Sequence, residues 1–237
     1  MQLGSGPLSQ GGPERLSIAV LPLHHPSPNF GPRRDGLKPH LIVLHYTAMQ
    51  SAQAALDRLC DPAAEVSAHY LIGGDGRLFQ LVEEAQRAWH AGAGEWAGLT
   101  DINSRSIGIE LDNTGTHPFS EPLMTCLEAL LAQIMQRWGI RPEGVIGHSD
   151  MAPGRKVDPG PHFDWTRLAR QGLAQPVGVA GGDEPLTSDA FRARARAAGF
   201  TAPVDDPTLL AAVRLRFRPH GSGPLCAADL TALPIAG

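Results

Sequence analysis

Pro39-His40-Leu41-Ile42-Val43-Leu44-His45 contains four consecutive apolar residues that end at a histidine. A short continuous apolar run of this kind is typical of a strand that is covered on both faces inside an α/β domain. His45 follows the run at its carboxyl end, where open α/β sheets place their binding sites. The stretch therefore predicts a buried central strand with a histidine positioned for chemistry.

The patterns around this strand predict an α/β fold with a central mixed β-sheet flanked by helices. Residues 106–111 alternate as a strand should, which places Ser106, Gly108 and Glu110 on one face and Ile107 and Ile109 on the other. Capping residues, helical spacing of apolar residues and glycine-rich turns mark the remaining elements. We expect strands at 66–72, 77–82 and 145–147, and helices at 51–60, 120–138 and 164–173.

Composition divides the chain into four parts. Residues 1–38 are rich in Gly, Pro and Ser and show no sustained period, which predicts an extended N-terminal arm outside the core. Residues 39–173 form the main domain, and 174–186 read as a linker. Residues 187–237 predict a small C-terminal helical domain with helices near 188–198, 207–216 and 226–233. About fifty residues are marginal alone, so this domain is expected to dock on the first.

Charge and cysteine content exclude several classes of protein. The net charge of −4, with no block of Lys or Arg, gives no electrostatic footprint for nucleic acid. Three widely separated cysteines indicate neither a disulfide framework nor a thiolate zinc site. The sequence shows no export signal and no apolar stretch long enough to span a membrane, so we expect a cytoplasmic protein, or a periplasmic one if the start is misassigned. It carries no indication of the oligomeric state.

Three residues are candidate metal ligands. The run Gly147-His148-Ser149-Asp150-Met151-Ala152-Pro153-Gly154-Arg155-Lys156-Val157-Asp158-Pro159-Gly160-Pro161 follows a short strand and contains His148 and Asp158, while His45 ends the central strand. Two imidazoles and one carboxylate leave the fourth position of a tetrahedral zinc ion for water, as in catalytic sites. A lone histidine beside a strand is more often a structural residue, but the joint pattern favours Zn²⁺.

Several motifs in one order resemble those of the zinc-dependent N-acetylmuramoyl-L-alanine amidases. This family includes muropeptide-recycling and outer-membrane amidases and is kin to peptidoglycan recognition proteins. The likeness covers about 28–173. Its motifs are Ser27-Pro28-Asn29-Phe30, Ile42 through Thr47, Val66 through Ile72, Ala88-Trp89-His90-Ala91-Gly92, Asn103 through Glu110, and the run from Gly147 to Pro161.

The resemblance implies that 39–173 is a catalytic domain in which His45, His148 and Asp158 bind zinc and Glu110 and Lys156 form the catalytic pair. A zinc ion would lower the pKa of its water toward about 7 and polarise the amide oxygen. Glu110 would orient that water and accept its proton, and Lys156 would share the negative charge of the tetrahedral intermediate. Taken singly, each of these two residues reads as an ordinary solvated charge.

Other residues carry weaker indications. Trp89, Asn103 and Arg155 are candidates for contacting sugar, peptide amides or a peptide carboxylate, although such loop residues are also common without a ligand. His69 reads as a structural group that holds a ligand, and His90 reads as part of the cleft lining. In the same loop, 84–104, Trp96 is also expected to face the cleft. The C-terminal helices resemble a degenerate peptidoglycan-binding module, with a helical cap as the alternative.

The expected activity is hydrolysis of the amide bond between N-acetylmuramic acid, including its 1,6-anhydro form, and L-alanine in peptidoglycan fragments (muropeptides). The alternative from a different class is a protein that recognises muropeptides without cutting them. The complete ligand set, His45, His148 and Asp158, with Glu110 beside it, favours the enzyme. An unrelated metallohydrolase acting on another amide or ester is disfavoured by the motifs alone.

Overall fold

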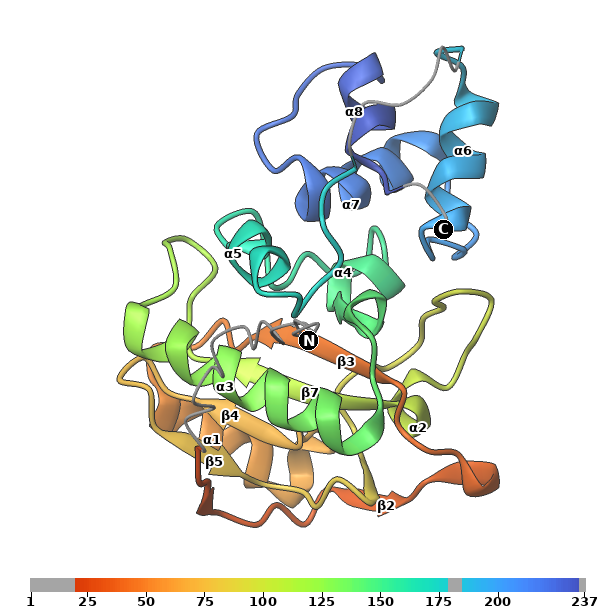
Figure 1. Ribbon diagram of the computed structural model, residues 1–237. Coiled ribbons are helices and arrows are strands. Elements are labelled where there is room, and N and C mark those ends of the chain that lie inside the picture. Colours follow the sequence, from red (N-terminus) through yellow and green to blue (C-terminus); the bar gives the residue numbers. More distant parts are fainter. Residues whose placement is uncertain (1–19, 179–184, 235–237) are drawn as a thin grey trace, which may run out of the picture.

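The computed structural model describes residues 20–178 and 185–234, and its centre is a six-stranded mixed sheet (Figure 1). The strand order is β1-β5-β4-β7-β3-β8, in which β4 and β5 are antiparallel and every other pair is parallel. This confirms the expected fold class. The strands are β1 (Leu23–His24), β3 (Leu41–Tyr46), β4 (Tyr70–Ile72), β5 (Leu78–Gln80), β7 (Ser106–Leu111) and β8 (Val145–Gly147).

The interpretation of the N-terminal segment as an arm outside the core is wrong for residues 20–38; residues 1–19 lie outside the described part of the chain. Strand β1 extends the main sheet, and β2 (Phe30–Pro32) pairs with β6 (Gln86–Ala88). Asn29 is buried, and its amide nitrogen donates to the carbonyl oxygens of Asp61 and Val66, both at 2.8 Å. The polar composition gave no indication of this burial, because the side-chain amide of Asn29 is hydrogen-bonded to backbone carbonyl groups instead of to water.

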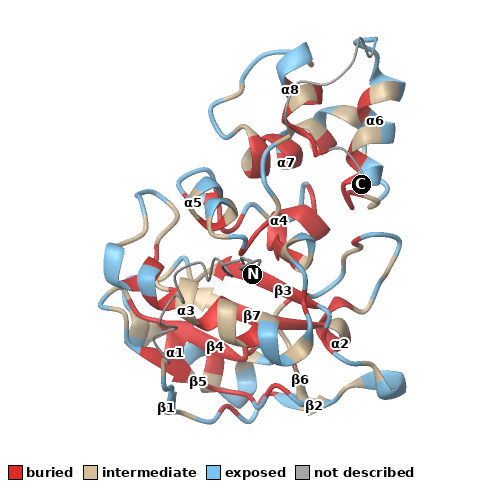
Figure 2. Ribbon diagram, in the orientation of Figure 1, coloured by how far each residue is buried: buried red, intermediate tan, exposed pale blue. Residues whose placement is uncertain are grey.

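One long helix and one shorter helix cover the two faces of the sheet (Figures 1 and 2). Helix α3 (Glu121–Trp138) begins after the cap Ser120 and ends at Gly139, whose φ of 67° suits glycine. Its apolar side packs on Ile42, Leu44 and the other side chains of that face. Helix α1 (Ala52–Cys60) packs on the opposite face, against Leu71 and Phe79. Shorter helices are α2 (Ile102–Arg105), α4 (His148–Met151) and α5 (Trp165–Arg170), with 3-10 turns at Arg34–Gly36, Pro62–Ala64 and Pro142–Gly144.

Three helices form the C-terminal domain, close to the ranges expected from the sequence: α6 (Ser188–Ala197), α7 (Asp206–Phe217) and α8 (Ala227–Ala232). Their apolar side chains share one buried cluster with Leu41, Val43 and Ile146 of the main sheet, so the domain is docked. Trp96 belongs to this contact. It is 7% exposed and meets Phe200 edge to face at 5.0 Å, which corrects the expectation that it faces a cleft.

Two further properties of the fold concern the cysteines and the hydrophobicity of the helices. Cys60, Cys126 and Cys226 form no disulfide. Within residues 20–178 and 185–234, none of the helices combines the length and the hydrophobicity that a bilayer-spanning segment requires.

Candidate active site

The sheet brings the three candidate ligands together from distant parts of the chain. Along β3 the side chains alternate, so His45 lies on the face opposite α3. Strand β8 is the parallel neighbour of β3 and leads directly into α4, which begins with His148. The loop that follows returns to this point, where the backbone N–H of Ser149 donates to the carbonyl oxygen of Asp158 at 2.9 Å.

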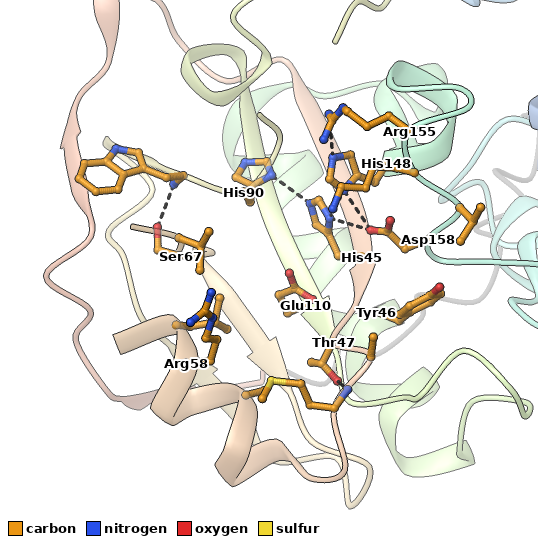
Figure 3. A pocket seen from close by; sticks show the side chains of 18 residues that line it. His45, Tyr46, Thr47, Arg58, Ser67, His90, Glu110, His148, Arg155 and Asp158 are labelled. Carbon is orange, nitrogen blue, oxygen red and sulfur yellow. Dashed lines mark hydrogen bonds and ion pairs between the residues drawn. The ribbon is translucent and has the colours of Figure 1, made fainter. Parts of the chain in front are cut away.

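The ligand atoms form a small triangle (Figure 3). His45 Nδ1 lies 2.9 Å from His148 Nδ1 and 2.9 Å from Asp158 Oδ2, and His148 Nδ1 lies 3.1 Å from the same carboxylate oxygen. Bond lengths near 2.0–2.1 Å in a tetrahedral zinc site place neighbouring ligand atoms about 3.3 Å apart. All three residues are buried, and this triangle has the size that one metal ion requires.

Hydrogen bonds on the far side of each imidazole leave both Nδ1 atoms free to bind a cation. His148 Nε2–H donates to the carbonyl oxygen of Ala91 at 2.9 Å. His45 Nε2 lies 3.0 Å from His90 Nδ1, and His90 Nε2 lies 3.1 Å from the hydroxyl of Ser106, which donates to the carbonyl oxygen of Ile102. Because the Ser106 hydroxyl donates to Ile102, it accepts from His90 Nε2, and His90 Nδ1 in turn accepts from His45 Nε2. This series of hydrogen bonds places the proton of His45 on Nε2 and its lone pair on Nδ1.

Electrostatics give the site the protonation states that a metal ion needs. Burial, together with repulsion from His148, lowers the pKa of His45 to about 4, so its imidazole is neutral at neutral pH. Burial alone would raise the pKa of Asp158, but its close contacts with the imidazoles of His148 and His45 outweigh burial and hold that pKa well below its usual range. The Nδ1 atoms of His45 and His148, each left without a proton by the hydrogen bond on the other side of its ring, and the Asp158 carboxylate present three acceptor atoms to one point, and a cation there would satisfy all three.

Glu110 lies beside this group on the neighbouring strand. In the pairing of β3 with β7 it is the register partner of His45, on the same face of the sheet as Ser106 and Gly108, as the alternation predicted. Its Oε2 is buried and has no hydrogen-bond partner among the described residues. Burial, and secondarily the charge of Asp158, raises the pKa of Glu110 well above its usual range. A buried carboxyl group with a raised pKa is a stronger base than an exposed one, as a general base requires.

The ligands and Glu110 line a pocket of about 400 Å³, which also contains Lys156. Lys156 is half-buried, and its ammonium makes no hydrogen bond or ion pair with residues 20–178 or 185–234. Its charge acts on the carboxyl group of Glu110, whose pKa it lowers against the effect of burial. A free ammonium is thus available on the wall of the pocket.

The three candidate substrate contacts are placed differently. Trp89 is half-buried and lines the pocket. Arg155 also lines it, but its guanidinium donates to the carbonyl oxygens of Ala91, at 2.8 Å, and Ala93, so it holds the loop beneath His148. Asn103 does not line the pocket. Its Oδ1 accepts the backbone N–H groups of His90, at 3.0 Å, and Ala91, at 2.8 Å, which makes it a support for that loop.

His90 is more closely tied to the ligands than the sequence indicated. Its ring lies against Gly108 of β7, where a Cβ would come within 2.4 Å of the ring, so only glycine allows the ring to rest on the sheet. The motif Trp89-His90-Ala91-Gly92, read with the strand Ser106-Ile107-Gly108, carried this signal. His69 holds the sheet instead, since its Nδ1 accepts the N–H of Gly108 at 3.0 Å and it touches no ligand.

Such a site is typical of enzymes that hydrolyse an amide or ester with one metal ion. A family model described as N-acetylmuramoyl-L-alanine amidase matches residues 35–161, more than half of the chain. The chain belongs to this family, which confirms the resemblance and the class of enzyme predicted from the sequence.

Two curated members of the family are similar to this chain in sequence. N-acetylmuramoyl-L-alanine amidase AmiD of Escherichia coli K12 is 42% identical over 149 residues, which are 56% of this chain and 53% of AmiD. The chain thus spans about half the length of that relative. The 1,6-anhydro-N-acetylmuramyl-L-alanine amidase AmpD of Enterobacter cloacae is 36% identical over 162 residues, 61% of this chain and 87% of AmpD.

A solved structure extends the likeness to the C-terminal domain. It is the complex of E. coli AmiD with the substrate anhydro-N-acetylmuramic acid-L-Ala-D-γ-Glu-L-Lys, with a TM-score of 0.74 and 31% identity. It covers 86% of this chain and 88% of the AmiD chain. Residues 1–173 make up less than 86% of this chain, so the matched part also includes residues of the C-terminal helices.

Proposed function

We propose that the protein is a zinc-dependent amidase that hydrolyses the bond between the lactyl group of N-acetylmuramic acid and L-alanine of the stem peptide. The observation that carries the proposal is the convergence of His45, His148 and Asp158 within about 3 Å of one another, beside the buried carboxyl group of Glu110. Muropeptides with the 1,6-anhydro sugar are included as substrates, because AmpD is named for them and AmiD has been solved with one.

Zinc is the ion that this donor set fits best. Imidazole nitrogen with one carboxylate suits a borderline ion such as zinc, whereas magnesium and calcium prefer oxygen donors alone. When bound, zinc would polarise the scissile carbonyl and lower the pKa of water toward about 7. The hydrogen bonds from His148 to Ala91 and between His45 and His90 hold both imidazoles in the orientation that such an ion needs.

Glu110 acts as the proton carrier. Its unpartnered Oε2 is available to accept a proton from the attacking water, and burial, which raises the pKa of its carboxyl group, makes it a stronger base. The amine of L-alanine needs one proton to leave. The same carboxyl group can deliver it, so that Glu110 returns to its starting state after each turnover.

Lys156 acts on the charge that develops on the amide oxygen. Attack of water on the carbonyl places a negative charge on this oxygen, and the Lys156 ammonium on the pocket wall is available to stabilise that charge. Trp89 provides an apolar surface in the same pocket for the sugar or the peptide. A recognition protein that does not cut its ligand would have no use for the complete set of His45, His148, Asp158 and Glu110.

The test is incubation of the purified protein with anhydro-N-acetylmuramyl tripeptide, with and without a chelator, followed by mass spectrometry. We expect release of the free sugar and the peptide, loss of this activity with chelator, and recovery with added zinc. Asp158→Ala should lose activity, because only two ligands remain. Intact substrate under zinc-replete conditions would favour recognition without hydrolysis, and full activity of Asp158→Ala would refute the ligand assignment.

A further inference from the structure

Arg216 is a buried arginine that joins the C-terminal helices to the part of the main domain that carries His148. It lies on α7 and is only 4% exposed. Its guanidinium donates to the carbonyl oxygen of Val145 at 2.9 Å, lies over the ring of Trp165 at 3.4 Å from the centroid, and faces Asp150 Oδ2 at 3.4 Å. One side chain thus contacts β8, α5 and α4 together.

Asp150 connects this arginine to the start of α4. Its Oδ2 also accepts the backbone N–H of Gly147 at 2.8 Å, directly before His148. Asp150 is 1% exposed, and its Oδ1 has no hydrogen-bond partner among the described residues. A buried carboxylate is costly without a cation near it. Arg216 therefore allows Asp150 to remain in the place from which it fixes the residue that precedes the ligand.

The C-terminal domain also contacts the loops on either side of α4. Helix α7 packs on α4 directly. Thr208 of α7 closes over Gly154, where a Cβ would come within 2.9 Å of the threonine methyl group. The carbonyl oxygen of Gly199 accepts the N–H of Ala97 at 2.9 Å, in the loop that follows Ala91. The domain thus contacts two loops next to α4, and none of its described residues lines the pocket.

We propose that Arg216 is a positioning residue of the metal site. It fixes the beginning of α4 through Asp150 and so holds His148 at the separation from His45 and Asp158 at which the three share one ion. The C-terminal helices are then part of the architecture of the active site, in addition to any contact they make with cell wall. This inference rests on the metal site of the proposed function, and it concerns metal affinity rather than substrate choice.

The decisive change is Arg216→Met, which keeps an apolar stem and removes the guanidinium. Loss of a group that orients a metal ligand weakens metal binding by about 10–100-fold, and we expect an effect near the lower limit because Arg216 acts through Asp150. The dissociation constant of zinc is measured by chelator competition. We also expect kcat to fall while KM for the muropeptide stays unchanged, as for a defect in the reacting centre rather than in substrate binding.

Arg214 provides a matched control on the same helix. It is 9% exposed and donates to both carboxylate oxygens of Asp229, at 2.9 and 2.7 Å, all within the C-terminal domain. Arg214→Met should lower the unfolding midpoint without changing zinc affinity. Arg216→Lys should recover part of the affinity, because lysine keeps the charge near Asp150 but cannot stack on Trp165 or donate as a fork.

Zinc affinity equal to that of the unaltered protein in Arg216→Met would overturn the positioning role. If that variant does not fold, zinc affinity is measured instead in the double variant with Arg216→Met and Asp150→Asn, in which the unpaired carboxylate has been removed. Equal losses in the Arg214 and Arg216 variants would also overturn it, since they would reflect stability alone. If the unaltered protein holds no zinc, the proposed function itself fails, which is a separate result.

Discussion

Replacement of His90 by phenylalanine tests whether the metal site depends on the hydrogen bond behind it. His45 Nε2 lies 3.0 Å from His90 Nδ1, and the ring of His90 rests on Gly108. Phenylalanine keeps an aromatic ring in this place but removes both nitrogens. In His90→Phe, therefore, His45 retains a buried N–H group without an acceptor, and the lone pair on Nδ1 is no longer fixed.

The size of the effect follows from this lost partner. A buried donor left without an acceptor costs about 1–3 kcal/mol. Removal of the group that orients a ligand imidazole weakens metal binding by about 10–100-fold, which corresponds to about 1.4–2.8 kcal/mol. The two ranges agree. We expect the dissociation constant of zinc, measured by competition with a chromogenic chelator, to rise by this factor in His90→Phe.

His69→Phe is the matched control. His69 is fully buried and accepts the N–H of Gly108 at 3.0 Å, but it touches no metal ligand. Its replacement should lower the free energy of unfolding and leave zinc affinity unchanged. Unaltered zinc affinity in His90→Phe, or equal loss in both variants, would refute the reasoning.

The remaining predictions concern the catalytic pair and pH. Glu110→Gln cannot accept a proton, so kcat should fall about 10²–10⁴-fold with zinc affinity retained; kcat within a few-fold of the unaltered value would remove Glu110 from this role. Lys156→Met should lower kcat about 10²–10³-fold, and a rise in KM alone would instead assign Lys156 to binding. The metal-free protein should lose stability as pH falls from about 6.5 toward 4, because the pKa of His45 is lowered to about 4 and only the unfolded chain takes up the proton in that range. The slope for one such histidine is about 1.4 kcal/mol per pH unit, measured by urea unfolding, and a flat profile would contradict it.

The parts of the fold with strong local periodicity could be predicted from the sequence. The apolar run before His45 and the alternation around Glu110 each fixed which face a side chain occupies, and the structure places both on one side of the sheet. The C-terminal helices followed from caps and apolar spacing. His45, His148 and Asp158 could be grouped because their spacing and neighbours resemble a family, whereas periodicity alone would not have joined them.

Features that depend on long-range contacts were missed or misread. Asn29 lies in a Pro-rich segment without periodicity, and only its backbone partners reveal that it is buried. Asn103 looked like a substrate contact because its bonds to His90 and Ala91 cannot be read from spacing. Arg216 gave no signal, since a charged residue on a helix reads as solvated until its partners are known. The cytoplasmic location and the peptidoglycan contact of the C-terminal domain stay predictions.

The separation of the ligands along the chain links metal supply to folding. His45 and Asp158 are 113 residues apart, so an unfolded chain has no preformed triad, and an ion that needs all three groups binds the folded state almost exclusively. Every tenfold increase of free ion above its dissociation constant then adds about 1.4 kcal/mol to the free energy of unfolding. The cation required for catalysis would at the same time stabilise the folded state of the whole domain.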